Sequence, residues 1–153
     1  MTFDLTSGKL AGDVLLQPKS DPFGGTTGIV FSPDGTEIAV LWRLLGKKDQ
    51  FGKVMVFDSA TGKRVATHEL NDLTSLESGA HGGLDCIQWV SDGSGWLLYG
   101  TLLVDRKTGK ELGRIGGEKK FGQRRFIGPE LLTSFKGGLD PSLSLESVRI
   151  TGR

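Results

Sequence analysis

The side chains that most often carry acid–base or metal chemistry are few in this sequence. His68 and His81 are the only two histidines, and Cys86 is the single cysteine. One cysteine excludes an internal disulfide and any metal site built from several thiolates. Cys86 lies within the apolar stretch LDCIQWV, so we expect it to be a small buried core residue. His68 falls on a predicted outer strand and His81 in a predicted loop, and nothing in this placement requires them to meet. We therefore assign no catalytic residue and no metal ligand.

The acidic residues that stand out lie beside glycines in short polar stretches. General acid–base catalysis needs carboxylates that converge in a cleft, whereas an aspartate at a turn accepts hydrogen bonds from nearby backbone N–H groups, and glycine supplies the positive φ that such turns need. The predicted turn residues are Asp34, Gly35, Asp58, Gly62, Asp92, Gly93, Asp105 and Gly109. No HExxH, P-loop, GxSxG or CxxC pattern occurs in the sequence. We expect neither enzymatic activity nor a cofactor.

Two basic clusters are the candidates for binding a partner. The 19 Lys and Arg against 18 Asp and Glu leave a net charge of +1, so no global field attracts nucleic acid or an anionic membrane. The first cluster is the lysine pair at 47–48, and the second comprises the basic residues between 119 and 125. The second cluster also contains Phe121 and Phe126, and basic residues mixed with aromatics can hold an acidic protein surface or a nucleic-acid strand. A solvated loop is the alternative. The candidate residues are Lys47, Lys48, Lys119, Lys120, Arg124 and Arg125.

A short motif recurs along the chain and indicates how these residues are positioned. FDSATGK at 57–63 is repeated in outline as FDLTSGK at 3–9 and VDRKTGK at 104–110. The interval is about 50 residues, which is typical of propeller blades and comparable arrays. The 24 glycines, roughly twice the usual share, indicate many tight turns between short elements. Together these features favour an all-β protein.

The stretches around each motif predict four strands apiece. GIVF and EIAVLW are separated by Pro-Asp-Gly, a hairpin turn, and are followed by KVMVF and by RVATHEL. The last stretch alternates, with Ala66, His68 and Leu70 on one face, as expected of an outer strand with one wetter face. We predict four-stranded antiparallel meanders, with outer strands of a blade in 1–16, blades in 28–70 and 84–116, and a partial blade in 124–151.

The stretch GIVFSPDGTEIAVLW followed by GKVMVFDSATGKRVATHEL resembles the WD-repeat family of β-propellers. The family's Trp-Asp pair is replaced by Phe57-Asp58 and Val104-Asp105, and its Gly-His pair survives as Ala80-His81-Gly82. The buried Asp, His, Ser and Trp network of that family is therefore incomplete here, as in a divergent, bacterial-type member. The resemblance implies blades held mostly by apolar packing, and a structural hydrogen bond for His81. Phe57 and Trp89 are expected to be buried between neighbouring blades.

By this resemblance, the expected function is a non-enzymatic scaffold whose loops at the blade rims bind another protein. A propeller that binds a small ligand or carbohydrate, a propeller-type enzyme and a nucleic-acid-binding segment remain alternatives. The sequence has no leader-like N-terminus and no run of about 18 apolar residues. We expect a soluble, cytoplasmic protein without a membrane span.

About three blades are present where propellers typically have 4 to 8. We therefore expect an open stack, completed by neighbouring blades of a longer parent chain or by self-association. The N-terminal strands could complete the last blade, within one chain or between two.

Overall fold

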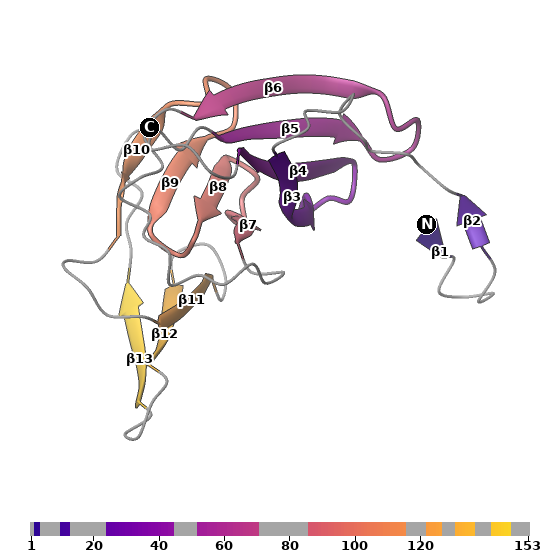
Figure 1. Ribbon diagram of the computed structural model, residues 1–153. Coiled ribbons are helices and arrows are strands. Elements are labelled where there is room, and N and C mark those ends of the chain that lie inside the picture. The colour runs from indigo at the N-terminus through magenta and orange to yellow at the C-terminus, as the bar shows by residue number, and fades with distance from the viewer. Residues whose placement is uncertain are drawn as a thin grey trace.

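The computed structural model describes residues 2–3, 10–12, 24–44, 52–70, 86–115, 122–126, 131–136 and 142–147. Within these ranges the elements are β-strands arranged in four antiparallel sheets, two of them four-stranded, and there is no helix. Figure 1 shows the two four-stranded sheets next to each other and β1 and β2 apart from them. The predicted all-β class is confirmed, and the sheets do not close into a barrel.

The first four-stranded sheet is a meander of consecutive hairpins. Its strands are β3 (Gly24–Phe31), β4 (Glu37–Leu44), β5 (Gly52–Asp58) and β6 (Arg64–Leu70), in the order β3-β4-β5-β6. The Pro-Asp-Gly stretch makes the turn between β3 and β4, where the Gly35 N–H donates to the Ser32 carbonyl at 2.9 Å. The predicted strands and hairpin are confirmed.

The second four-stranded sheet repeats this order. It contains β7 (Ile87–Trp89), β8 (Gly95–Leu98), β9 (Leu102–Asp105) and β10 (Glu111–Arg114), again with consecutive strands paired. The connection between β8 and β9 is a tight turn at Tyr99 and Gly100, whose φ values are 50° and 68°. A positive φ at a residue with a Cβ is uncommon. Here it allows β8 and β9 to be joined by only three residues, fewer than separate the corresponding strands β4 and β5 of the first sheet.

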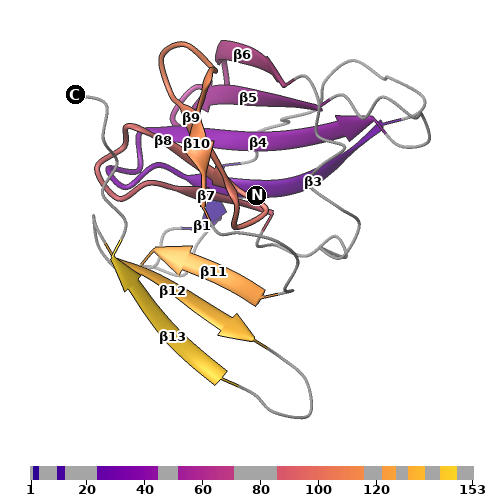
Figure 2. The ribbon, with the colours of Figure 1, turned by 90° about the vertical axis from the view of Figure 1, so that its left-hand side faces the viewer.

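The remaining described strands form two smaller sheets. β1 (Thr2–Phe3) pairs with β2 (Leu10–Gly12), and β11 (Gly122–Phe126), β12 (Leu131–Lys136) and β13 (Ser142–Ser147) form a three-stranded meander. Figure 2 shows β11–β13 as a layer separate from the four-stranded sheets. Because β1 and β2 pair with each other, they do not add to the edge of β11–β13 within this chain.

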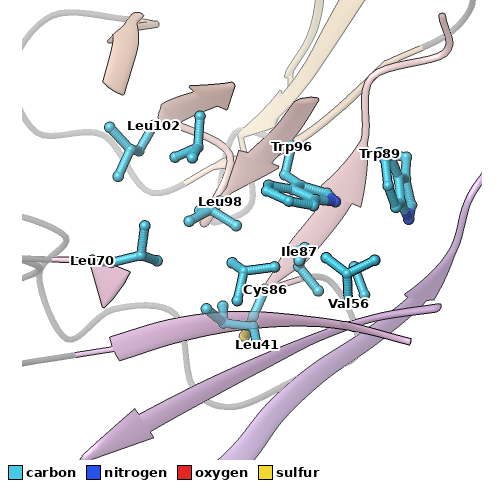
Figure 3. Close-up of a cluster of buried hydrophobic side chains, with 12 residues drawn as sticks. Leu41, Val56, Leu70, Cys86, Ile87, Trp89, Trp96, Leu98 and Leu102 are labelled. Atoms are coloured by element: carbon cyan, nitrogen blue, oxygen red, sulfur yellow. The ribbon is translucent and has the colours of Figure 1, made fainter. Parts of the chain in front are cut away.

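The two four-stranded sheets pack face to face around a shared apolar core. Figure 3 shows its side chains, which come from both sheets. The members are Ala39, Leu41, Val54, Val56, Leu70, Cys86, Ile87, Trp89, Trp96, Leu98, Leu102 and Val104. Gly28 on β3 lies against the second sheet, because a Cβ there would be 2.8 Å from Cγ2 of Ile87. The buried positions predicted for Cys86 and Trp89 are confirmed.

Each four-stranded sheet also buries apolar side chains on its other face. In the first sheet these are Ile38, Val40, Trp42, Met55 and Phe57, and in the second they are Val90, Leu97, Leu103 and Ile115. The predicted burial of Phe57 is confirmed. Successive residues of a strand point to opposite faces, and since Val56 faces the shared core, Phe57 faces away from the second sheet.

The outer strand β6 has the alternation that the sequence predicts. Ala66 and His68 are partly buried and Leu70 is buried, while Val65, Thr67 and Glu69 are exposed. In the described part of the chain there is no helix long and apolar enough to cross a membrane.

Candidate functional site

The four predicted turn aspartates all accept backbone hydrogen bonds. Oδ1 of Asp34, Asp58, Asp92 and Asp105 accepts the N–H of the residue two or three positions later, at 3.0, 2.7, 2.8 and 2.7 Å respectively. The glycines that close these turns, Gly35, Gly62, Gly93 and Gly109, have φ of 73°, 67°, 75° and 68°. The aspartates therefore shape turns, at equivalent places in the two sheets.

Hydrogen bonding to the ionised form makes these carboxyl groups more acidic. The Ser32 hydroxyl, followed by the Thr36 N–H and hydroxyl, lowers the pKa of Asp34 to about 2. The hydroxyl and N–H of Thr61 lower the pKa of Asp58, and those of Thr108 lower the pKa of Asp105. These three groups are ionised at neutral pH, so they add fixed negative charge to the rims of the sheets.

The two sheets are joined by polar contacts at one rim. Nε of Arg106, just after β9, donates to Oε2 of Glu37 at the start of β4 at 2.9 Å, and its Nη2 bonds Oε1 of the same carboxylate. Nε1 of Trp89 donates to the Val30 carbonyl on β3 at 3.3 Å. A two-pronged guanidinium–carboxylate pair fixes orientation as well as distance. This rim is therefore held in a defined geometry.

A pocket of about 670 Å³ opens at the same rim, between the β3–β4 turn and the β7–β8 turn. Its lining residues are Ser32, Pro33, Asp34, Thr36, Glu37, Trp89, Ser91, Asp92, Gly93, Arg106 and Lys107. Its volume lies within the range of small-molecule and peptide side-chain sites. The pocket exists because the sheets stack with equivalent turns side by side.

The pocket offers mixed polar chemistry around one aromatic ring. Asp34 and Asp92 are among the lining residues, Lys107 is exposed, and Trp89 also lines the pocket although it is only 5% exposed. The Ser91 hydroxyl is buried and has no hydrogen-bond partner among the described residues. The arrangement can bind a polar or charged segment with an apolar side chain.

His68 lies in the interface between the sheets. Its ring is 5.6 Å from that of Trp96, and the turn glycine Gly109 packs against it. Burial lowers the pKa of His68, and the positive charge of Arg106 lowers it further. Among the residues that the structure describes, no three His, Cys, Asp or Glu side chains are grouped as metal ligands. His81 lies outside the described residues.

The basic residues singled out from the sequence are not placed by the structure. Lys47, Lys48, Lys119 and Lys120 lie outside the described residues, and for Arg124 and Arg125 the structure gives only their position on β11. Their role in partner binding stays a prediction.

The pocket residues Glu37, Ser91 and Arg106 were not foreseen from the sequence. Arg106 occupies a position of the turn motif that is Leu5 in the copy at 3–9 and Ser59 in the copy at 57–63. Its charge was the available signal, although it did not indicate Glu37 as the partner. In the structure the Arg106 side chain links the two sheets.

The described strands define a class: an all-β protein with repeated four-stranded antiparallel meanders. Comparison with models of protein families and with curated proteins finds no significant match for this sequence.

Proposed function

We propose that the chain is a non-enzymatic, WD-repeat-like propeller segment that serves as a scaffold for protein binding. The observation that carries the proposal is the rim pocket, which two equivalent turns of two stacked meanders form together. A scaffold needs a surface of fixed shape. Arg106, in the β9–β10 turn, pairs with Glu37 beside the β3–β4 turn, and its N–H donates to the Ser94 carbonyl in the β7–β8 turn, so it holds these turns in place. The sequence resemblance of 28–70 to WD repeats supports the same function, by analogy of fold.

The chemistry of the pocket favours a peptide segment as the occupant. The lining combines an indole with carboxylates and a lysine, so it can contact an apolar side chain and charged groups of either sign at once. Asp34 stays ionised at neutral pH, which favours a basic residue in the bound segment.

Selection from a displayed peptide library on the immobilised full chain tests this function. The affinity of the selected peptides is then measured for two variants of the chain. Lys107→Glu reverses an exposed charge in the pocket, and Lys63→Glu makes the same change in the turn after β5, outside the pocket. We expect Lys107→Glu to change affinity about tenfold or more for the selected peptides, which corresponds to about 1.4 kcal/mol, and Lys63→Glu to leave it unchanged.

Both variants should keep the parent's circular dichroism spectrum and melting temperature, since both lysines are exposed. Equal effects of the two substitutions, or a library that yields no binder sensitive to Lys107, would contradict the proposed site.

A further inference from the structure

His68 on β6 packs closely against a turn of the neighbouring sheet. Gly109, in the β9–β10 turn, comes so near that a Cβ there would be 2.6 Å from both Cβ and Nδ1 of His68. The His68 ring is also tilted against the ring of Trp96 on β8, with 5.6 Å between the two centroids. Figures 1 and 2 both show the β9–β10 turn beside β6. His68 therefore contacts the second sheet at two places.

The β9–β10 turn also carries the polar contacts of the rim. The Arg106 N–H donates to the Ser94 carbonyl in the β7–β8 turn at 2.9 Å, and the Arg106 guanidinium pairs with the Glu37 carboxylate of the first sheet. Arg106 and Lys107 both line the rim pocket. A change that moves this turn away from β6 therefore acts on the link between the sheets and on the pocket.

The surroundings of His68 suit the neutral form of its ring. Nε2 is buried and has no hydrogen-bond partner among the described residues. A neutral imidazole carries one N–H and leaves its other nitrogen without a proton, whereas an imidazolium carries an N–H on both nitrogens. A charged donor that is buried without an acceptor is costly. Protonated His68 therefore fits the packed arrangement less well than neutral His68.

Two charged groups of the β9–β10 turn act on this ring with opposite signs. Burial has the largest effect on the pKa of His68 and lowers it, and the positive charge of Arg106 lowers it further. A hydrogen bond with the Arg106 backbone and the negative charge of Asp105 raise it by less. The pKa of the packed ring therefore lies below the ordinary value of 6.5.

In the described part of the chain, the other elements around His68 present uncharged side chains to it. These are Val54 on β5, Trp96 on β8, and Ala66 and Leu70 on β6. On β5, Lys53 lies on the far face of the sheet and Asp58 is held in its own turn. The remaining charged side chains of β6, the turn and β10 are exposed, namely Arg64, Glu69, Lys107, Lys110, Glu111 and Arg114.

We propose that His68 is a pH-sensitive contact between the two four-stranded sheets: the neutral ring holds the β9–β10 turn against β6, and protonation of the ring releases the turn and disrupts the rim pocket. The proposal concerns the contact between the sheets and does not depend on what the pocket binds.

The direction of the pH effect follows from the lowered pKa of His68. A released histidine takes up its proton as pH falls through about 6.5, whereas the packed ring does so only at lower pH. The released state therefore binds more protons between these two values. The stabilisation by the neutral ring is fully present above about pH 7 and is lost as pH falls through about 6.5 toward the lower pKa of the packed ring.

Cys86 can report on separation of the sheets, because it is the single cysteine and is 3% exposed in the shared core. Its rate of labelling by dithiodipyridine, a disulfide reagent that also reacts in mild acid, is measured in the full chain from about pH 7.5 to about pH 5.5. Division by the rate for the unfolded chain at the same pH removes the intrinsic pH dependence of the thiol. We expect the normalised rate to rise between about threefold and about tenfold, the upper limit being what one proton on an ordinary histidine supplies over this range.

Variants of both histidines assign this rise. His68→Gln cannot be protonated and should remove it. His68→Phe keeps a ring against Trp96 and serves as a second variant if His68→Gln fails to fold. His81→Gln removes the other histidine and is the matched control, whose normalised rate should rise as in the wild type.

NMR titration of the His81→Gln chain follows the single remaining histidine directly. The amide signal of Gly109 should shift with the same midpoint as the His68 ring, because Gly109 packs against that ring. A wild-type labelling rate that stays flat, a rise that persists in a folded His68 variant or is lost in His81→Gln, or a Gly109 signal that does not follow the histidine would overturn the proposal.

Discussion

Asp34 acts on the turn between β3 and β4 through several hydrogen bonds to a single carboxylate oxygen. Its Oδ1 accepts the Ser32 hydroxyl at 2.6 Å, the Thr36 N–H at 3.0 Å and the Thr36 hydroxyl at 2.8 Å. These bonds favour the ionised form and explain why the pKa falls to about 2. A residue in this role links the stability of the fold to pH.

Asp34→Asn should reduce the acid sensitivity of the protein. The folded-state pKa lies below the unfolded value of about 3.9, so the stabilisation by the carboxylate is fully present above about pH 4 and is lost as pH falls toward 2. We expect the wild-type melting temperature to exceed that of Asp34→Asn at pH 6, and the difference to shrink between pH 4 and pH 2.

Melting followed by circular dichroism as a function of pH measures this effect. Glu69→Gln, which removes an exposed carboxylate on β6, serves as the control and should run parallel to the wild type. A constant difference between Asp34→Asn and wild type down to pH 2 would show that the turn bonds do not depend on ionisation.

At the scale of elements, two turn glycines of the second sheet differ in their surroundings. Gly93, between β7 and β8, has φ of 75° and open space where a Cβ would lie. Gly109, between β9 and β10, has φ of 68°, and a Cβ there would be 2.6 Å from both Cβ and Nδ1 of His68. The second turn is thus also a packing contact with β6 of the neighbouring sheet.

Substitution by alanine separates the cost of the left-handed backbone conformation from the cost of the close contact with His68. Gly93→Ala should lower the free energy of unfolding by about 1–2 kcal/mol, the cost of a left-handed conformation for a residue with a Cβ. Gly109→Ala should lower it by about 1–3 kcal/mol more, because the added methyl group also displaces His68. Urea denaturation measures both values, and equal losses would show that the contact with His68 relaxes freely.

At the scale of the whole molecule, the two four-stranded sheets depend on one core. Trp96 on β8 is fully buried, and its ring lies 5.2 Å from that of Trp89 and 5.6 Å from that of His68 on the other sheet. Removal of an interior side chain shared by two sheets weakens both of them. The sheets are therefore expected to unfold as one cooperative unit.

Trp96→Ala should lower the free energy of unfolding by about 3–5 kcal/mol. In a background that also carries Trp89→Phe, Trp42 is the remaining tryptophan and reports on the first sheet by fluorescence, while far-UV circular dichroism reports on all strands. We expect both transitions to shift together in urea, as a two-state unit requires. Val65→Ala, at an exposed position, should stay within about 0.5 kcal/mol of the wild type. Separate transitions would show that the sheets fold independently.

The sequence by itself determined the local structure of this protein. Strand positions, the alternation of Ala66, His68 and Leu70 on β6, and the turns at Asp34-Gly35 and Asp92-Gly93 follow from interactions between residues close in the chain. The burial of Trp89 was also predictable, since it lies two residues from Ile87 on one face of an apolar stretch. Such features recur in both repeats and so could be recognised twice.

Only the tertiary structure decided which faces and turns meet. Phe57 and Val56 are equally apolar and buried, and their assignment to opposite faces depends on where the second sheet lies. The pocket depends on Arg106 reaching Glu37, two residues that are 69 positions apart in the chain. Local pattern specifies that a face is apolar but not what covers it, because burial of apolar surface is non-directional. The choice of partner comes from the shapes and polar contacts of complete sheets.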